Sequence, residues 1–298
     1  MHITIVSAGT RTARATIRHL LADASAPTVR GIYRDLSRVP DEFKSNARFE
    51  AVKGDIEDVS TLDFSGSQAI FVVEPPIYDE RDTVQHTKFI SENVKEAVKK
   101  APSVKRLVLL TSVGAQYDHG IGEILTNHTS EVVLKDAAPE VVFIRASYFM
   151  ETWASAVETI KEGSFFYTVA TPLDFAWPQI AGDDIGATAA EELLSTAPLK
   201  ANPYIFELHG PRVYSSIDTQ RAWAEAAGKD IEVRPVEREG LGEYFGSFLG
   251  PVRVKEYVDM TLSFLPGGII HQDPNPTGEV RKGKTELVEV FKQLLGTA

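Results

Sequence analysis

The sequence predicts an α/β protein, with a doubly wound parallel sheet and a smaller α/β second part. Over residues 1–150, short apolar runs alternate with amphipathic helical segments. The run AIFVV at 69–73 contains no polar residue, as expected for a strand covered by helices on both faces. A strand, a tight turn and a helix fill residues 1–21. This order predicts crossover helices on both faces of the sheet and a ligand at the carboxyl ends of its strands.

The elements of the first half follow from periodicity and breakers. We expect strands at 2–6, 27–33, 49–53, 69–73, 106–110 and 141–145, and helices at 14–21 and 82–100. In the longer helix, Phe89, Val94, Ala97 and Val98 are expected to face inward because they share one apolar stripe.

The second half is less regular. We expect strands at 204–208 and 231–236, a helix at 216–228, and a helix to residue 194 with Asp183 or Asp184 as its N-cap. The domain prediction places 1–152 in the sheet domain, to which 179–210 return. Residues 153–178 and 211–298 then form a small substrate or cap domain.

Composition narrows the classes of function. The chain has 298 residues, of which 43% are hydrophobic, and a net charge of −11, so nucleic-acid binding is not expected. The absence of Cys excludes disulfides, thiolate metal sites and a Cys nucleophile, and no cluster has metal-ligand spacing. No signal peptide is evident and no stretch approaches the roughly 20 apolar residues of a membrane span. We therefore expect a cytoplasmic protein without a membrane partner.

The turn after the first strand is the first candidate binding site. A helix N-terminus offers free N–H groups and a positive dipole end to a pyrophosphate. Against the pattern Gly-x-x-Gly-x-x-Gly, this chain has Ser7, Thr10 and Ala13, with Gly9 out of register. Ala13 can pack the helix on the strand, but Ser7 and Thr10 can replace glycine only with ordinary backbone angles. Two interpretations stay open: a dinucleotide site made by Ser7, Gly9, Thr10, Arg11 and Thr12, or a turn that holds no cofactor.

Charged residues at the end of the second strand bear on which dinucleotide would bind. An acidic residue at this place holds the ribose 2′-hydroxyl of NAD, whereas an Arg accommodates the 2′-phosphate of NADP. Arg34 precedes Asp35, and Arg11 in the turn is a second cation. The pattern favours NADP if a dinucleotide binds at all; the alternative is a solvated loop.

Other strand ends complete the predicted cofactor site. Asp55 and Ile56 follow the third strand, where a loop often lies beside an adenine ring, although Asp55 could equally be a helix cap. Glu74 ends the fourth strand, and Thr111 ends the fifth. Ser112, next to Thr111, could hydrogen-bond a substrate oxygen or only close a turn.

Several stretches resemble the NmrA-like family, atypical members of the short-chain dehydrogenase/reductase group. They are the opening strand–turn–helix, Gly54-Asp55, 73–76 (VEPP), 106–112 (RLVLLTS), 144–151 (IRASYFME), 181–186 (AGDDIG) and 279–284 (EVRKGK). The resemblance implies a Rossmann domain that binds NADP(H) or NAD(H), with a small substrate domain. It is nearest to fungal secondary-metabolism members. It also implies a cleft wall at Tyr148, Phe149 and Met150, to which we add Trp177.

The chain departs from ordinary short-chain dehydrogenases at the catalytic motif. None of its nine tyrosines has a Lys four residues on, so the usual Tyr-x-x-x-Lys acid is absent. His128 and Glu131 lie in the same region, three residues apart on an expected helix, and so share a face. His128 could transfer a proton near neutral pH, with Glu131 orienting it. The alternative is a surface His beside a surface Glu.

Three functions are compatible with these features. The first is an NADP(H)-dependent reductase of an apolar or aromatic carbonyl or enone compound, with His128 or water as proton source. The second is an NADP-sensing regulator without turnover. The third is a cofactor-free isomerase, dehydratase or cyclase that uses His128 and Glu131. The expected partner is a small-molecule substrate, and a homodimer is an open alternative to a monomer.

Overall fold

Eight parallel strands form the large sheet, in the order β13-β10-β6-β5-β4-β1-β2-β3. In this computed structural model, which describes residues 1–273 and 278–297, the sheet confirms the predicted doubly wound α/β fold. Its strands are β1 (His2–Val6), β2 (Thr28–Tyr33), β3 (Phe49–Lys53), β4 (Ala69–Val72), β5 (Arg106–Ser112), β6 (Glu140–Ala146), β10 (Tyr204–His209) and β13 (Val280–Lys282).

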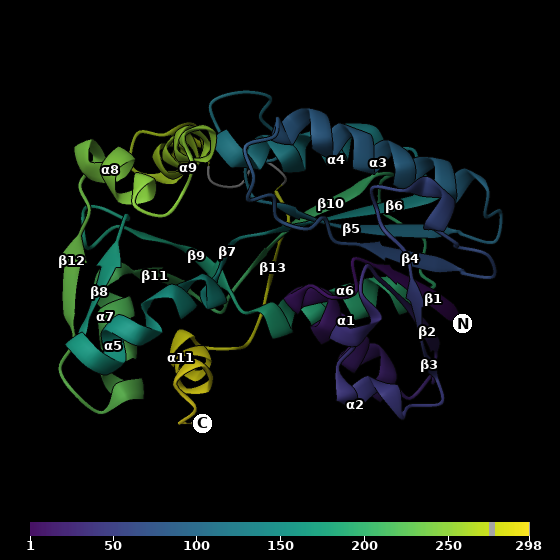
Figure 1. The fold of residues 1–298 in the computed structure, drawn as a ribbon, viewed down its shortest axis with the longest axis horizontal. Coiled ribbons are helices and arrows are strands. Elements are labelled where there is room, and N and C mark those ends of the chain that lie inside the picture. Colours follow the sequence, from purple (N-terminus) through teal and green to yellow (C-terminus); the bar gives the residue numbers. More distant parts are fainter. Residues whose placement is uncertain (274–277, 298) are drawn as a thin grey trace.

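Helices cover both faces of the large sheet (Figure 1). The helices α1 (Arg11–Ala22), α2 (Asp41–Lys44) and α6 (Gly182–Leu194) lie on one face, and α3 (Thr83–Lys99) and α4 (Leu125–Leu134) lie on the other. Short 3-10 helices, labelled η, occur at Leu36–Arg38 (η1), Val59–Thr61 (η2), Gly122–Ile124 (η3), Met150–Ala156 (η4) and Arg238–Gly240 (η5). The N-terminus, where β1 begins, lies at the side of the sheet away from the second part (Figure 1), so the carboxyl ends of the parallel strands face the second part.

The second part contains two small sheets with their own hydrophobic core. One sheet joins β11 (Val213–Ser215), β9 (Ala176–Ile180) and β7 (Tyr148–Phe149), and the other pairs β12 (Glu232–Pro235) with β8 (Phe165–Thr168). Trp223 stacks on Phe291 in this core, with ring centroids 3.8 Å apart. The helices are α5 (Val157–Gly163), α7 (Ser216–Ala227), α8 (Leu241–Gly246), α9 (Pro251–Phe264), α10 (Ile269–Gln272) and α11 (Leu287–Leu295).

Three sequence-based expectations need correction. The strand Val280–Lys282 lies within the segment assigned to the second domain, but it pairs with β10 in the large sheet. Phe89, expected to face inward, is 47% exposed. The N-cap of α6 is Ala181 rather than Asp183 or Asp184. The carboxylate of Asp184 instead accepts hydrogen bonds from the N–H groups of Lys284 and Thr285, both 2.9 Å, and so holds the chain beyond β13.

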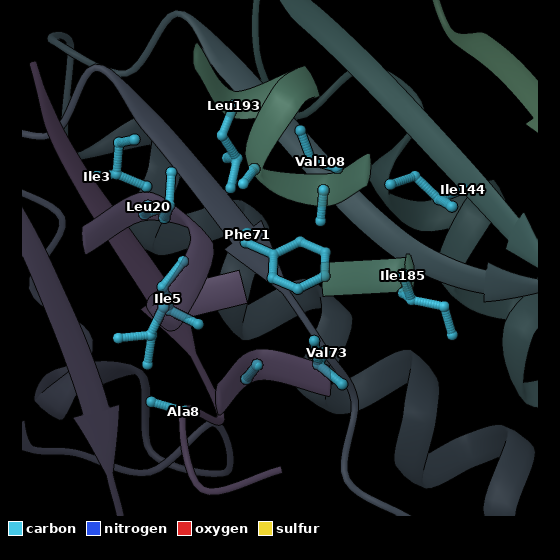
Figure 2. Close-up of a cluster of buried hydrophobic side chains, with 14 of the residues drawn as sticks. Ile3, Ile5, Ala8, Leu20, Phe71, Val73, Val108, Ile144, Ile185 and Leu193 are labelled. Atoms are coloured by element: carbon cyan, nitrogen blue, oxygen red, sulfur yellow. The ribbon is translucent and has the colours of Figure 1, made fainter. Parts of the chain in front are cut away.

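A continuous apolar layer fixes α1 and α6 against the sheet. Figure 2 shows Phe71 of β4 at the centre of this layer, between Leu20 of α1 and Ile185 of α6. All three side chains are fully buried. Because the same layer contains Ala8, it reaches the turn that follows β1.

The helices α1 and α6 approach each other closely at Gly186. A Cβ atom at Gly186 would lie 2.5 Å from the Cβ of Ala15 and 2.7 Å from its carbonyl carbon. The second of these atoms belongs to the backbone of α1, so it cannot move without shifting the helix. Glycine is therefore required here to keep α1, and the turn before it, in place.

We expect Gly186→Ala to lower the free energy of unfolding by about 1–3 kcal/mol, because the added methyl group overpacks the helix contact. Gly242→Ala is the matched control: Gly242 lies in α8 with nothing within 4 Å of its would-be Cβ, so alanine should be neutral or stabilising there. Urea denaturation of both variants measures the difference. Equal stability of the two would contradict the close packing.

Candidate functional site

The turn between β1 and α1 keeps a glycine-like backbone without a glycine at its first position. Ser7 has φ +59°, in the left-handed region, whereas Thr10 has φ −72° and acts as the N-cap of α1. Thr10 therefore meets the expectation of an ordinary conformation, and Ser7 does not. A non-glycine residue in this region costs about 1–2 kcal/mol. Ser7 thus adopts the backbone shape that glycine would give, with a hydroxyl added at the site.

Several N–H groups of this turn are free to bind an anion. Ala8 N–H donates to the carbonyl of Ile32 and Thr10 N–H to that of Ser7, both at 3.0 Å. In the described part of the chain, the N–H groups of Gly9, Arg11 and Thr12 have no such partner. These groups stand at the start of a 12-residue helix, where the dipole also favours negative charge. The turn can therefore hold a pyrophosphate.

Cations surround the carboxyl end of β2. Arg11, Arg34 and Arg38 are exposed, and none forms an ion pair within residues 1–273 and 278–297. Asp35, the acidic residue that would bind a ribose hydroxyl, caps η1 instead: its carboxylate accepts the Ser37 N–H at 2.9 Å. Hydrogen bonds from Ser37 hold the pKa of Asp35 below its usual range. This corner of the site is therefore basic, although the whole chain is acidic.

The loop after β3 is organised by its own hydrogen bonds. Asp55 accepts the Glu57 N–H at 3.0 Å, while the Asp55 N–H donates to Thr61 Oγ1 at 2.8 Å. Ile56 is buried, and its carbonyl accepts a hydrogen bond from Asn93 of α3 at 3.0 Å. This loop is thus tied to α3 beside the carboxyl ends of β2 and β3.

The expected pair of His128 and Glu131 is not formed. Glu131 lies in a buried ion pair with Arg145 of β6 at 2.6 Å, and it also accepts a hydrogen bond from Thr111 Oγ1 at 2.8 Å. Thr111, predicted to bind cofactor, therefore faces α4. Arg145 was not among the predicted residues, but a lone Arg in the apolar run VVFIR signals a buried charge that needs a partner.

His128 is held by the backbone instead. Its Nδ1 atom lies 2.9 Å from the carbonyl oxygen of Ala115. A carbonyl can only accept, so Nδ1 carries a hydrogen and Nε2 is left to accept a proton. Ser112, at the end of β5, donates its hydroxyl hydrogen to the Val113 carbonyl at 3.0 Å. Both side chains remain partly exposed near the end of the sheet.

The predicted cleft-wall residues lie where the sheet meets the second part. Tyr148 lies 6.1 Å from both Trp153 and Trp177, measured between ring centroids, and burial raises its pKa. Phe149 is partly buried, whereas Met150 and Trp177 are buried in the core of the second part. In the conformation described, Tyr148 and Phe149 are thus more accessible to a substrate than Met150 and Trp177.

Helix α9 covers this side of the site. Its Arg253 is fully buried, donates to the Arg81 carbonyl at 2.8 Å and pairs with Glu256 at 2.7 Å. Glu256 in turn accepts a hydrogen bond from Thr83 of α3 at 2.9 Å. These contacts anchor the second part to the loop between β4 and α3.

A cavity elsewhere in the described structure lies at the opposite end of the sheet from this site. A cavity of about 310 Å³ lies at the amino end of the sheet, beside Met1, Lys105 and Glu140, which is opposite to the end where such sheets bind ligands. Within residues 1–273 and 278–297, no group of three or more His, Cys, Asp or Glu residues could hold a metal ion. None of the helices described there combines the length and apolar character needed to cross a bilayer.

Solved structures share this fold over nearly the whole chain. The Citrobacter triphenylmethane reductase has a TM-score of 0.74 at 16% identity, over 99% of this chain and 100% of its own. An NADPH-dependent quinone oxidoreductase from Escherichia coli, complexed with NADPH, has a TM-score of 0.74 at 16% identity, covering 98% and 99%. A nucleoside-diphosphate-sugar epimerase from Staphylococcus aureus has a TM-score of 0.72 at 13% identity, covering 98% and 100%. At these identities the likeness shows the fold alone.

The sequence of the sheet domain also matches a family model. The model for the NAD(P)H-binding family matches residues 8–191, which include the turn after Ser7 and every strand end from β2 to β6. No curated protein sequence matches the chain. The chain belongs to the NAD(P)H-binding family.

We expect Glu131→Gln to lower the free energy of unfolding by about 3–5 kcal/mol, because it leaves the Arg145 guanidinium buried without a counter-charge. The control Glu50→Gln removes an exposed partner of Arg30 and should cost less than about 1 kcal/mol. Chemical denaturation of the two variants compares them. A loss of activity in Glu131→Gln with wild-type stability would favour a catalytic over a structural role.

Proposed function

We propose that this chain is an NADPH-dependent reductase of the NmrA-like, atypical short-chain dehydrogenase/reductase type. Its substrate would be a small apolar or aromatic carbonyl or enone compound. The observation that carries this proposal is the set of unpaired Arg11, Arg34 and Arg38 around a helix start whose N–H groups are free. A role in secondary metabolism and a cytoplasmic location are further parts of the proposal, and they rest on the resemblance and the sequence.

The preference for NADPH over NADH follows from charge. A 2′-phosphate placed beyond β2 would be attracted by Arg34 and Arg38, and Arg11 approaches from the turn. Asp35 would repel this phosphate if its carboxylate pointed at it, but the carboxylate is directed at Ser37. The buried Nε of Arg14, in the first turn of α1, has no hydrogen-bond partner among the described residues and adds a further unsatisfied donor.

The bound dinucleotide would supply the hydride, and the chain would supply positioning and a proton. The free N–H groups of the turn fix the pyrophosphate. Ser112 stands at the end of β5, where its hydroxyl would donate to a substrate oxygen by leaving the Val113 carbonyl that it now bonds. His128, held through Nδ1 by the Ala115 carbonyl, lies near the same end of the sheet with Nε2 free to accept a hydrogen bond. Aromatic side chains of the second part favour an aromatic substrate, in keeping with the dye and quinone substrates in the names of two structural neighbours.

The direct test measures NADPH oxidation by the purified protein in the presence of a naphthoquinone and of a set of enones. We expect oxidation that depends on the added compound and saturates with it. Saturable NADPH binding without turnover would favour the regulator. Conversion of a compound without any nucleotide, abolished by His128→Ala, would favour the cofactor-free enzyme.

We expect Arg34→Ala to weaken NADPH binding about tenfold or more and NADH binding less than about twofold. A hydrogen bond between charged groups contributes about 1.5–3 kcal/mol, and only NADPH has the 2′-phosphate. Arg18→Ala is the control, since Arg18 is an exposed Arg of α1 paired with Glu42. Calorimetric titration of wild type and of both variants with each nucleotide gives the six affinities. Equal weakening of both nucleotides by Arg34→Ala would contradict the assignment.

A further inference from the structure

Glu74 occupies the position next to the nucleotide turn on the neighbouring strand. It is the second residue after the end of β4 at Val72, and β4 pairs with β1 on one side and β5 on the other. The strand order reverses between β1 and β4, which is the switch point where doubly wound sheets bind ligands. Glu74 therefore borders the space between the turn at the end of β1 and Ser112 at the end of β5.

The carboxylate of Glu74 is held by two hydroxyl groups from different helices. Ser91 of α3 donates to Oε1 at 2.6 Å, and Ser130 of α4 donates to Oε2 at 2.5 Å. The side chain is partly buried, and within residues 1–273 and 278–297 no Lys, Arg or His forms an ion pair with it. Glu74 thus has an orientation fixed by hydrogen bonds and no counter-charge.

The charges that face Glu74 do not neutralise it. The charged group that acts on it is Glu123 of η3, and Glu123 itself lies near Glu256 and Arg253 of α9. Burial, and the charge of Glu123, raise the pKa of Glu74 to about 7, against the opposing effect of the hydrogen bonds from Ser130 and Ser91. Near neutral pH this carboxyl group can both give and take a proton.

Glu131, which is also near Ser130, has a different kind of partner from Glu74. Glu131 follows Ser130 in α4 and is buried, but Arg145 supplies its counter-charge at 2.6 Å. The fold therefore neutralises the buried carboxylate of Glu131 with a cation, and holds that of the partly buried Glu74 with hydroxyl groups alone. The second arrangement leaves the proton of Glu74 exchangeable.

We propose that Glu74 is the proton donor of the reaction carried out at this site. This inference rests on the proposed reductase function. In the reduction of a carbonyl compound, a hydride adds to the electrophilic carbon, and the π electron pair moves to the oxygen. The Glu74 carboxyl gives its proton to that oxygen, or to the α-carbon of the enolate formed from an enone. The resulting carboxylate keeps its hydrogen bonds from Ser91 and Ser130 until water returns a proton.

The first test titrates Glu74 in the protein without nucleotide or substrate. Infrared spectra across pH 5–9 should show a protonated carboxyl that disappears with a midpoint near 7, and the Glu74→Gln variant should lack it. Ser130→Ala should shift the midpoint upward by about one unit, because the carboxylate loses a donor that stabilises its charge. Glu92→Gln, which removes an exposed carboxylate from the same helix as Ser91, should leave the spectrum unchanged.

Stability gives an independent readout of the same proton. The folded-state pKa of Glu74 lies above its value in an unfolded chain, so protonation stabilises the fold. This stabilisation is complete below about pH 4.5 and is lost as pH rises through about 7. The Tm of Glu74→Gln should therefore fall less than that of wild type over this interval.

The second test compares pH profiles of turnover. The wild-type kcat should fall about tenfold per pH unit above the midpoint. Glu74→Gln should lower kcat at and below the midpoint and remove this fall, while leaving NADPH affinity within about threefold. Ser130→Ala should move the fall to higher pH. A wild-type profile that Ser130→Ala does not move, or a Glu74→Gln variant with unchanged kcat, would overturn the proposal. Absence of NADPH binding in wild type would instead overturn the reductase function, whatever the spectra of Glu74 show.

Discussion

The left-handed backbone at Ser7 is the constraint on which the candidate site depends. β1 ends at Val6 and α1 begins at Arg11, so the chain must reverse within four residues. The reversal is tied to β2 through Ala8 and to the helix start through Thr10. Gly186 lets α6 press α1 against the sheet, and Asp184 of the same helix holds the chain after β13. The turn, the first helix and the end of the large sheet thus form one connected unit.

Charge is distributed to suit a nucleotide at one end of this unit. The chain carries a net charge of −11, yet the arginines around the turn and the end of β2 have no ion pairs among the described residues. The carboxylates near them are occupied in local caps, as Asp35 shows. Two carboxylates deeper in the site are treated differently. Glu131 is neutralised by its ion pair with Arg145, whereas Glu74 has no such partner among the described residues and can take up a proton because its pKa is raised.

The sequence was sufficient for the fold and for part of the site. Continuous apolar runs predicted the strands of the large sheet, because both faces of each strand are covered. Short strands, such as β7 of the second part and β13 at the edge of the large sheet, carry no period-two signal long enough to detect. The partners of individual side chains were harder to predict than the strands. Spacing of three residues suggested His128 with Glu131, but Arg145 of another element supplies the stronger partner; Asp184, likewise, bonds the chain 100 residues away. The left-handed angle of Ser7 had no signal beyond its place in the glycine pattern.

The most direct test of nucleotide binding at the turn is a titration of the isotope-labelled protein with NADPH. NMR follows the backbone amide signals of residues 8–12. If the turn holds a pyrophosphate, the amides of Gly9, Arg11 and Thr12 should shift saturably, because their N–H groups acquire an acceptor. The amides of Ala8 and Thr10, already bonded within the turn, should respond less. Unchanged signals at the turn up to millimolar NADPH, equivalent to a binding free energy weaker than about −4 kcal/mol, would contradict the account.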